Sequence, residues 1–474
     1  MTIRLYNTMS RKLEEFKPLQ EGKVGFYSCG PTVYHYTHLG NLRTFLHNDF
    51  LKRMFLENGY EVRHVMNITD VGHLTNEEND SGEDKMERSA ARDNKTVWDI
   101  AKFYKDEFMR DFNDLNMIAP TVMPHATDYI AEQIELVQKL EELGYTYEIP
   151  NDGIYYDTSK FVAYGTLTGG SLSGNRAGAR VDYNDSKRNP TDFALWKFSP
   201  KDIKRQMEWD SPWGVGFPGW HAECSAMSMK LLGNHFDIHT GGEDLSRVHH
   251  ANEIAQSEPI TGAPWVNTWL HYSFLLDKSG EKMAKSKGEF LGMDAVRTRG
   301  YDPMVYRYFV ALGHYQSQLA FSWETMDSAA KGYANIVRRA ADFMGMSSDV
   351  INQEVYNKWH DDMLAAMSDN LKTASVMVLV QEFIKAEEIN PATKIALFEF
   401  VDRLLGLQFI DRAKKLFALE SESAPSEIVA LAESRAAAKA NKDWATADAL
   451  RAQIDVAGWA VLDGKDGYKI VKKA

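Results

Sequence analysis

The chain has 474 residues, of which 44% are apolar and 26% charged, and this balance predicts a soluble globular protein of about three domains. The net charge of −13 argues against a non-specific nucleic-acid binder, although it leaves room for local basic patches that hold one RNA. No apolar window is long enough for a membrane span, the first residues lack a secretory signal, and two cysteines form no disulfide framework, so we expect a cytoplasmic protein.

The first part of the chain alternates short strand-like and helix-like segments. Residues 23–29 (KVGFYSC) are rich in strand formers and run into Gly-Pro, and residues 41–60 carry apolar side chains at helical spacing and close on a glycine turn. Residues 61–69 (EVRHVMNIT) are the next strand candidate. Strand, helix and strand in this order form a βαβ unit, which predicts an α/β domain with a parallel sheet.

An insertion into this sheet domain is expected at residues 121–212, where the composition and the hydrophobic pattern of the sequence change. It begins with an amphipathic helix, and residues 152–167 (DGIYYDTSKFVAYGTL) then form a strand candidate in a Gly- and Ser-rich setting. Strand-then-loop patterning resumes at residues 236–245 (FDIHTGGEDL). We therefore expect the sheet domain to comprise residues 1–120 and 213–321.

The C-terminal part is predicted to be mostly helical. Residues 322–419 are poor in glycine and carry apolar residues at helical spacing, which predicts a helical bundle. Residues 420–427 (ESESAPSE) are typical of a linker. Residues 428–474 then predict a charged, Ala-rich helix pair followed by a hairpin, a small α+β tail.

The tail is a candidate RNA contact because basic residues gather in it. Trp444 and Tyr468 could stack on an unpaired base, although a core position is an equal alternative for Trp444. The basic residues are Arg435, Lys439, Lys442, Arg451, Lys465, Lys469, Lys472 and Lys473.

Two short motifs point to a phosphate-binding site. In the tetrad HLGN, which begins at His38 and follows a strand, Gly40 lets the backbone approach a ligand and the helix start offers free N–H groups to anions. In KMAKS, Lys282 and Lys285 lie in a Gly-rich loop, where they could hold a triphosphate. Taken alone, each motif is better explained without a phosphate site, HLGN as a chance tetrad and KMAKS as a solvated charged loop.

A metal site is the third candidate. Cys29 precedes the tetrad, and Cys224 is the second of the two cysteines. His249 with Glu253 is spaced i, i+4 and His250 with Glu253 is spaced i, i+3, so either imidazole could share one helix face with the carboxylate. Two thiolates, an imidazole and a carboxylate are a plausible zinc set, although dispersed ligands without a CxxC pair are more often structural residues.

HLGN followed by KMAKS resembles the HIGH and KMSKS signatures of class I aminoacyl-tRNA synthetases. Longer segments resemble the cysteinyl-tRNA synthetase family and occur in the family's order: FYSCGPTVY, NITD, DFALWK, WDSPWGVGFPGWHAECSAMS, GNHFDIHTGGEDL, HHANEIAQSE, KMAKSKG and HYQSQLAFS. The resemblance covers essentially the whole chain. It implies a Rossmann-like catalytic domain with an inserted connective domain, then a helical-bundle anticodon-binding domain at 322–419 and a small tRNA-binding domain at 428–474.

The resemblance also implies the residues of the site. The implied zinc ligands are Cys29, Cys224, His249 and Glu253, which favours His249 over His250. The implied catalytic residues are His38, Asn41, Lys282 and Lys285. The implied ATP site comprises Gly30, His38, Gly40, Asn41, Gly241, Gly242, Asp244 and Lys285. Thr69 and Trp220 are expected to line the amino-acid pocket.

The implied reaction is that of a cysteine–tRNA ligase. L-Cysteine is activated with ATP to cysteinyl-adenylate and then transferred to the 3′-terminal adenosine of tRNA(Cys), with one zinc ion per chain that selects the substrate thiolate and Mg²⁺ that accompanies ATP. We expect a monomer that binds no membrane. The alternatives are a cysteine ligase that acts on a small amino sugar, against which the long C-terminal regions argue, and a non-catalytic tRNA-binding relative.

The sequence departs from the family pattern at a few positions. Asn41 replaces the last His of HIGH and cannot be cationic, Ala284 replaces the middle Ser of KMSKS, and Ala251 replaces a Glu beside the implied metal. The acidic stretch 72–84 (GHLTNEENDSGED) is expected to be a solvated flexible loop, with a divalent-cation site as the lesser alternative.

Overall fold

The computed structural model describes residues 1–72, 74–76, 81–169, 186–200, 204–277, 280–281, 290–346, 350–421, 424–464 and 467–472. The chain forms two compact units, residues 1–329 with 362–377 and residues 330–361 with 378–474. Within these described ranges, every helix is too short or too polar to cross a membrane.

The first unit is built on a parallel sheet with the strand order β12-β11-β3-β4. Its strands are β3 (Lys23–Ser28), β4 (Glu61–Met66), β11 (Phe236–Gly242) and β12 (Val266–Tyr272). The inner strand β3 buries Val24, Phe26 and Tyr27 on both faces, as expected for a strand covered by helices on both sides. The predicted α/β fold with a parallel sheet is confirmed.

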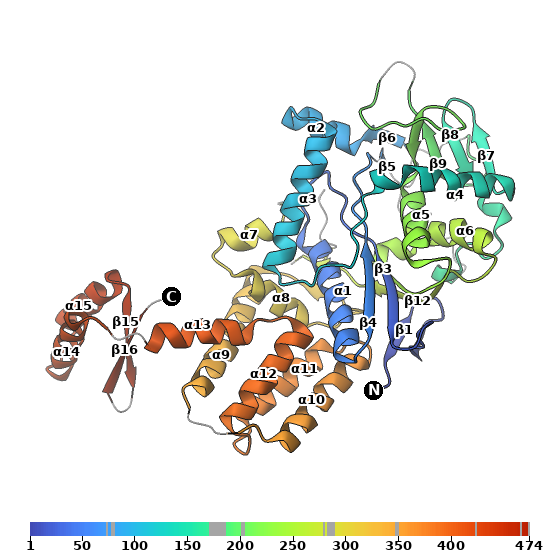
Figure 1. Cartoon of the computed structure of the whole chain (residues 1–474). Helices are drawn as coiled ribbons and strands as arrows, with labels where there is room; N and C mark the ends of the chain where they lie inside the picture. The colour runs from blue at the N-terminus through green and yellow to red at the C-terminus, as the bar shows by residue number, and fades with distance from the viewer. Residues whose placement is uncertain are drawn as a thin grey trace. The chain divides into compact units, whose positions relative to one another are not determined.

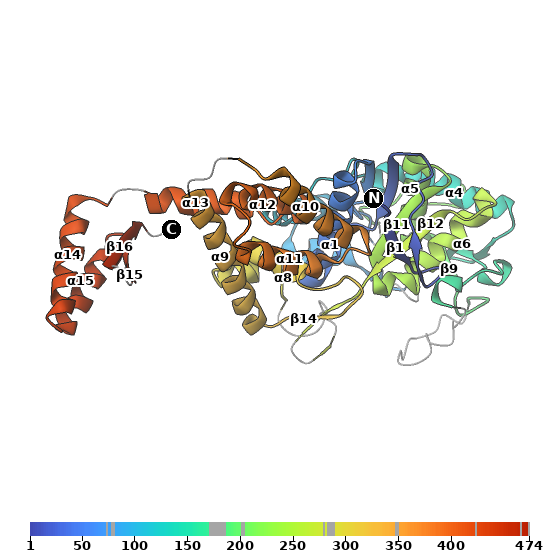
Figure 2. The same cartoon turned by 90° about the horizontal axis from the view of Figure 1, so that it is seen from below.

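Helices cover both faces of this sheet. Helix α1 (Leu39–Glu57) connects β3 to β4, and helix α6 (His249–Thr261) connects β11 to β12 in the opposite direction along the sheet. Right-handed crossovers that run in opposite directions place their helices on opposite faces. Figures 1 and 2 show α1 on one side and α5 (Trp220–Leu232) with α6 on the other. A crevice therefore opens between β3 and β11, at the carboxyl ends of both strands.

Further elements complete the first unit. They are β1 (Arg4–Asn7), β2 (Lys12–Glu15), β5 (Leu74–Asn76), β6 (Ser81–Asp84), α2 (Lys85–Asp93), α3 (Val97–Asp114), β13 (Leu275–Leu276), α7 (Met293–Thr298), α8 (Pro303–Ala311) and β14 (Leu319–Ala320). Strands β5 and β6 pair as an antiparallel hairpin within the stretch expected to be a solvated loop. That expectation is wrong for Asp84, whose side chain is 7% exposed because Arg205 pairs with it.

A second sheet follows helix α4 (Ile130–Glu142) and is antiparallel, in the order β10-β9-β8-β7. Its strands are β7 (Thr146–Ile149), β8 (Gly153–Tyr156), β9 (Phe193–Phe198) and β10 (Gly216–Pro218). Tyr156, Phe193 and Trp196 bury their rings in its core. The Gly- and Ser-rich residues 170–185 lie outside the described part of the chain.

The region after residue 322 is helical, as predicted. Its helices are α9 (Trp323–Met344), α10 (Gln353–Ser368), α11 (Thr373–Lys385), α12 (Pro391–Leu405) and α13 (Phe409–Ser421). Helix α12 begins at a proline, which suits the first helical position, and its cap Asn390 accepts a hydrogen bond from Thr393 N at 2.9 Å. Its apolar face buries Phe398, Val401 and Leu404.

The tail forms a helix pair and a hairpin, as predicted: α14 (Ser426–Ala440), α15 (Trp444–Val456), β15 (Trp459–Gly464) and β16 (Gly467–Lys472). Because α13 extends to Ser421 and α14 begins at Ser426, the segment between the helices is shorter than the predicted linker. The core of the tail comprises Ile428, Ala432, Ile454, Trp459 and Val461, and Tyr468 packs against it.

The basic residues of the tail differ in what they contact. Arg435 is 5% exposed and donates two hydrogen bonds to Asp463 at 3.0 and 2.9 Å, and Lys439 pairs with the same carboxylate at 2.8 Å. Arg435 therefore stabilises the fold of the tail and is not part of an exposed basic surface. Trp444 is 59% exposed, so the core position considered for it is wrong. Lys465 and Lys473 lie outside the described residues.

Candidate active site

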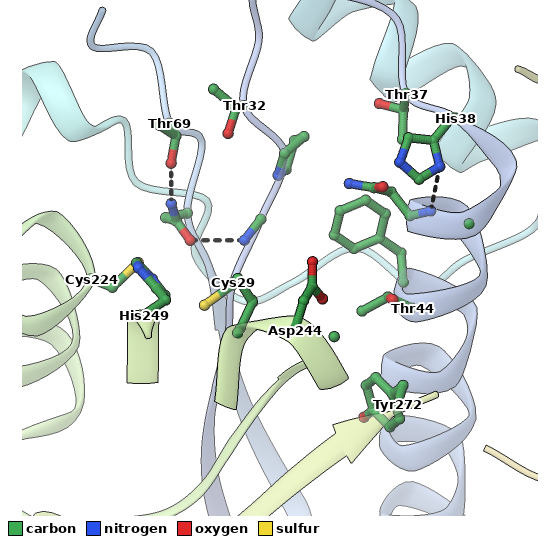
Figure 3. Close-up of a pocket in the computed structure, with 18 of the residues that line it drawn as sticks. Cys29, Thr32, Thr37, His38, Thr44, Thr69, Cys224, Asp244, His249 and Tyr272 are labelled. Atoms are coloured by element: carbon green, nitrogen blue, oxygen red, sulfur yellow. Dashed lines mark hydrogen bonds between the residues drawn. The ribbon is translucent and has the colours of Figure 1, made fainter. Parts of the chain in front are cut away.

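A cavity of about 310 Å³ lies at the carboxyl ends of β3 and β11, the point where the sheet's connections reverse. Figure 3 shows the thiols Cys29 and Cys224 near one end of it and His38, at the start of α1, near the other. The expected site residues that line it are Cys29, Gly30, His38, Gly40, Asn41, Thr69, Trp220, Cys224, Gly242, Asp244 and His249. Lys282 and Lys285 lie outside the described residues.

The HLGN tetrad forms the start of α1. His38 is the N-cap residue, and its Nδ1 accepts a hydrogen bond from Asn41 N at 3.3 Å. Gly40 lies against this ring, because a Cβ added there would meet His38 Cε1 at 2.9 Å. The backbone of His38 also pairs with Gly292, which follows the KMAKS segment in the chain. A helix N-terminus that faces a cavity suits an anionic ligand such as a phosphate.

A buried asparagine joins the two segments expected to contact the amino acid. Asn67 Oδ1 accepts from Gly30 N at 2.9 Å, and Asn67 Nδ2 donates to Thr69 Oγ1 at 2.9 Å (Figure 3). A Cβ on Gly30 would lie 1.6 Å from the carbonyl oxygen of Asn67. The two backbone segments can therefore lie this close together only because residue 30 is glycine. Asn67 lies in the NITD segment, but no motif or spacing in the sequence marked it as a site residue.

The two glycines that end β11, Gly241 and Gly242, have different surroundings. Gly242 and Asp244 line the cavity, whereas Gly241 is not among its lining residues. A Cβ on Gly241 would meet His250 Cε1 at 2.7 Å and Leu245 Cδ1 at 2.8 Å. The first glycine therefore permits close packing beneath the site, and the second lies at its surface.

Four possible metal ligands converge at the thiol end of the cavity. One donor atom each of Cys29, Cys224, His249 and Glu253 lies within 4.8 Å of the others. Glu253 is fully buried and accepts from His239 Nε2 through its Oε2 at 2.7 Å. Its Oε1 lies 2.7 Å from His249 Nε2 but has no hydrogen-bond geometry there or elsewhere among the described residues.

This arrangement fits a zinc ion. Two sulfurs, one imidazole nitrogen and one carboxylate oxygen are donors that zinc accepts, and a buried carboxylate oxygen without a hydrogen bond is satisfied by a cation. His221 contacts Nδ1 of His249 at 2.9 Å, which leaves Nε2 on the side of Glu253. Trp220 stacks on His249 with ring centroids 4.2 Å apart, and both rings line the cavity.

The ionisation of the cluster follows from its contacts. Burial would raise the pKa of Cys224, but the hydrogen bond with Cys29 and the charge of His249 lower it to about 7. Burial, together with the hydrogen bond with Cys224, raises the pKa of Cys29 well above its usual value. Burial opposes the charged form of His249, yet the charge of Glu253 raises its pKa to about 10. Without a metal ion, therefore, these contacts favour the thiolate of Cys224 and the protonated form of His249.

A second, overlapping donor set shares two of these residues. Cys29, His239, His250 and Glu253 also place donor atoms within 4.8 Å of one another, and His250 Nε2 lies 3.3 Å from Cys29 Sγ. Only Cys29 of this second set lines the cavity, whereas Cys29, Cys224 and His249 all line it. A ligand in the cavity therefore reaches the first set more directly. His239 lies in the GNHFDIHTGGEDL segment, but no spacing in the sequence marked it as a possible ligand.

Comparisons with known proteins place the chain in a family. Residues 15–331 match the model of the class I (C) tRNA synthetase catalytic domain. The chain is 43% identical to the cysteine–tRNA ligase of Treponema denticola, with all of both chains covered, and 43% identical to cysteine–tRNA ligase 1 of Burkholderia lata, with 99% of this chain and 97% of the relative covered.

A solved structure shares the fold at low identity. The methionyl-tRNA synthetase of Mycobacterium tuberculosis, in complex with methionyl-adenylate, is 14% identical with a TM-score of 0.54, over 85% of this chain and 94% of the other. At that identity the likeness concerns the fold alone. The full-length identity to the curated relatives carries the assignment: the chain belongs to the cysteine–tRNA ligase family.

Proposed function

We propose that this protein attaches L-cysteine to tRNA(Cys) in two steps, activation with ATP to cysteinyl-adenylate and transfer to the terminal adenosine. The observation that carries the proposal is one cavity that holds both a thiol-rich metal-ligand cluster and a helix N-terminus suited to phosphate. An amino acid with a thiol and a nucleotide with phosphates could meet between them. The family membership supports the same substrates.

In the activation step, the protein contributes mainly by positioning the reactants and by stabilising the charge on the phosphates. We assign His38 and Asn41 to the phosphate oxygens at the start of α1, with Mg²⁺ accompanying ATP. Lys282 and Lys285 are assigned from the sequence to the charge that develops on the leaving pyrophosphate. Gly30, Gly40, Gly241, Gly242 and Asp244 are assigned to the nucleotide site.

Selection of cysteine is assigned to the other end of the cavity. Cys29, Cys224, His249 and Glu253 would hold one zinc ion, which supplies a soft Lewis acid that prefers a thiolate to an alcohol. Thr69 and Trp220 both line the cavity. The hydrogen bond from Asn67 fixes Thr69, and stacking on His249 fixes Trp220, so we assign both to orienting the amino acid. We place the reaction in the cytoplasm and assign anticodon binding to the helical bundle and a further tRNA contact to the tail.

Pyrophosphate exchange into ATP tests this function. Exchange should depend on cysteine, and serine should be rejected by more than the roughly 10- to 200-fold that a simple pocket achieves between near-isosteres. Purified protein should also charge tRNA(Cys) and carry about one zinc per chain. Cysteine-independent exchange, or no exchange by zinc-loaded protein, would show that the assignment is wrong.

A further inference from the structure

Helix α2 carries a lysine into the cavity that the family motifs do not include. Among the described residues that line the cavity, Lys85 is the one lysine or arginine. Its Nζ lies over the ring of Tyr34, 5.4 Å from the centroid, and Tyr34 also lines the cavity. The carboxylate of Asp244 lines the same space. A polyanionic ligand placed there would meet one basic side chain from this part of the chain.

The residue before Lys85 is held firmly. Asp84 caps α2 by accepting hydrogen bonds from Met86 N at 2.7 Å and Glu87 N at 3.0 Å. Arg205 pairs with the Asp84 carboxylate, and both side chains are less than a tenth exposed, at 8% and 7%. A Cβ on Gly72 would meet Asp84 Oδ2 at 2.1 Å, so the carboxylate lies directly against the backbone there. The base of the lysine side chain is therefore fixed.

Further contacts fix the helix relative to the cavity wall. Arg205 donates to the Gly72 carbonyl oxygen at 3.2 Å and stacks on the ring of Phe217 at 3.6 Å. Ser89, one turn along α2, donates through Oγ to the carbonyl oxygen of Tyr34 at 3.0 Å. A lysine on a rigid base loses less conformational freedom on binding an anion than one on a free loop.

We propose that Lys85 binds a phosphate group in this cavity and is a substrate-positioning residue of the reaction. The inference rests on the proposed function, which places two sources of phosphate in the cavity: the triphosphate of ATP and the terminal nucleotide of the tRNA. A lysine ammonium is a compact point charge that suits a phosphate oxygen from either source. Tyr34, whose ring centroid lies 5.4 Å from Nζ of Lys85, lines the same cavity and offers an aromatic face to this side chain.

The test compares three variants. Lys85→Met keeps the apolar stem that packs on Tyr34 and removes the charge, and Lys85→Arg keeps the charge. Lys95→Met is the matched control, because Lys95 also lies over an aromatic ring, that of Phe103 at 4.6 Å, but does not line the cavity. Cysteine-dependent pyrophosphate exchange reports on the ATP phosphate, and single-turnover transfer from preformed adenylate reports on the tRNA phosphate.

We expect Lys85→Met to weaken one of the two steps by about 10- to 100-fold, the usual effect of losing a charged hydrogen bond. If ATP is the source, the KM for ATP rises in exchange while the KM for cysteine and the zinc content hold. If tRNA is the source, exchange is normal and transfer slows. Lys85→Arg should recover most of the loss, and Lys95→Met should match the wild type.

Three results would overturn the inference: both steps within twofold of wild type, a rise confined to the KM for cysteine, or an Arg variant as impaired as the Met variant. A wild-type protein without any exchange would overturn the proposed function instead. Calorimetric titration with pyrophosphate would then decide the role of Lys85, since equal affinity of wild type and Lys85→Met would show that this lysine holds no phosphate.

Discussion

Replacement of Asn67 by alanine tests how the amino-acid end of the cavity is held together. Asn67 is 1% exposed, and its two hydrogen bonds join Gly30 to Thr69. Asn67→Ala leaves the Gly30 N–H and the Thr69 hydroxyl without these partners, and a buried polar group that loses its partner costs about 1–3 kcal/mol. Because both groups line the cavity and water can reach them, we expect a total near the lower end, about 2 kcal/mol.

This loss converts into a measurable change in melting temperature. The first unit contains about 345 residues, and unfolding entropy is about 2.1 cal/mol/K per residue, so the unit's unfolding entropy is about 0.7 kcal/mol/K. A loss of about 2 kcal/mol should lower its Tm by roughly 3 °C. Calorimetry of the purified full-length variant beside the wild type measures the shift.

The kinetic consequence separates a site effect from a general loss of stability. Asn67→Ala should raise the KM for cysteine in pyrophosphate exchange more than the KM for ATP, because Gly30 and Thr69 lose their relative position. Asn7→Ala is the matched control: Asn7 is 6% exposed, accepts from Trp269 N at 3.1 Å and does not line the cavity. It should lower Tm with both KM values unchanged. Equal effects of the two variants on the KM for cysteine would refute the reasoning.

Cys224→Ser should lower the zinc content measured by elemental analysis and raise the KM for cysteine more than that for ATP; unchanged zinc would make this thiol a core residue only. In metal-free protein, the ultraviolet absorbance of thiolate should rise through pH about 7 as Cys224 ionises. Since this pKa is lowered, its contribution to stability is present above the ordinary thiol pKa of about 8.5 and is lost as pH falls through about 7; Cys29→Ala, which removes the donor of the lowering hydrogen bond, should move the midpoint upward. Lys282→Ala and Lys285→Ala should mainly lower kcat for exchange, because they act on charge that develops in the transition state, and a change in the KM for cysteine alone would contradict that role. Trp444→Ala should weaken tRNA charging and leave exchange unchanged, and equal charging by the variant would exclude this exposed ring from the tRNA contact.

The features that could be predicted from the sequence are those that neighbouring residues decide. The alternation of strand and helix patterns predicted the parallel sheet, and the place of His38 directly before the apolar period of α1 predicted a helix start, which lies at the cavity. Capping and periodicity act over a few residues, so no distant contact is needed to read them. The family motifs indicated which side chains are candidates for the site, including the thiols of Cys29 and Cys224.

The choice between His249 and His250 could not be predicted from the spacing of residues along the helix. Both lie on the first turn of α6, and both contact the cluster, His249 at Glu253 and His250 at Cys29. Which ring also faces the cavity depends on how α6 packs against α5, which carries Trp220 and Cys224. Helical spacing places both imidazoles near one carboxylate and cannot give the direction from which a ligand arrives.

The sequence by itself determined the order of the elements and which side chains are candidates for the site. Only the tertiary structure decided which charges are buried and which face a ligand. Asp84, in a stretch that composition assigns to solvent, is buried by Arg205, 121 residues away in the chain, and the same contact fixes the base of Lys85. Arg435, which composition assigns to an RNA surface, is buried against Asp463. A charged residue has the same local propensity in either setting, and its burial depends on a partner that only the folded chain brings to it.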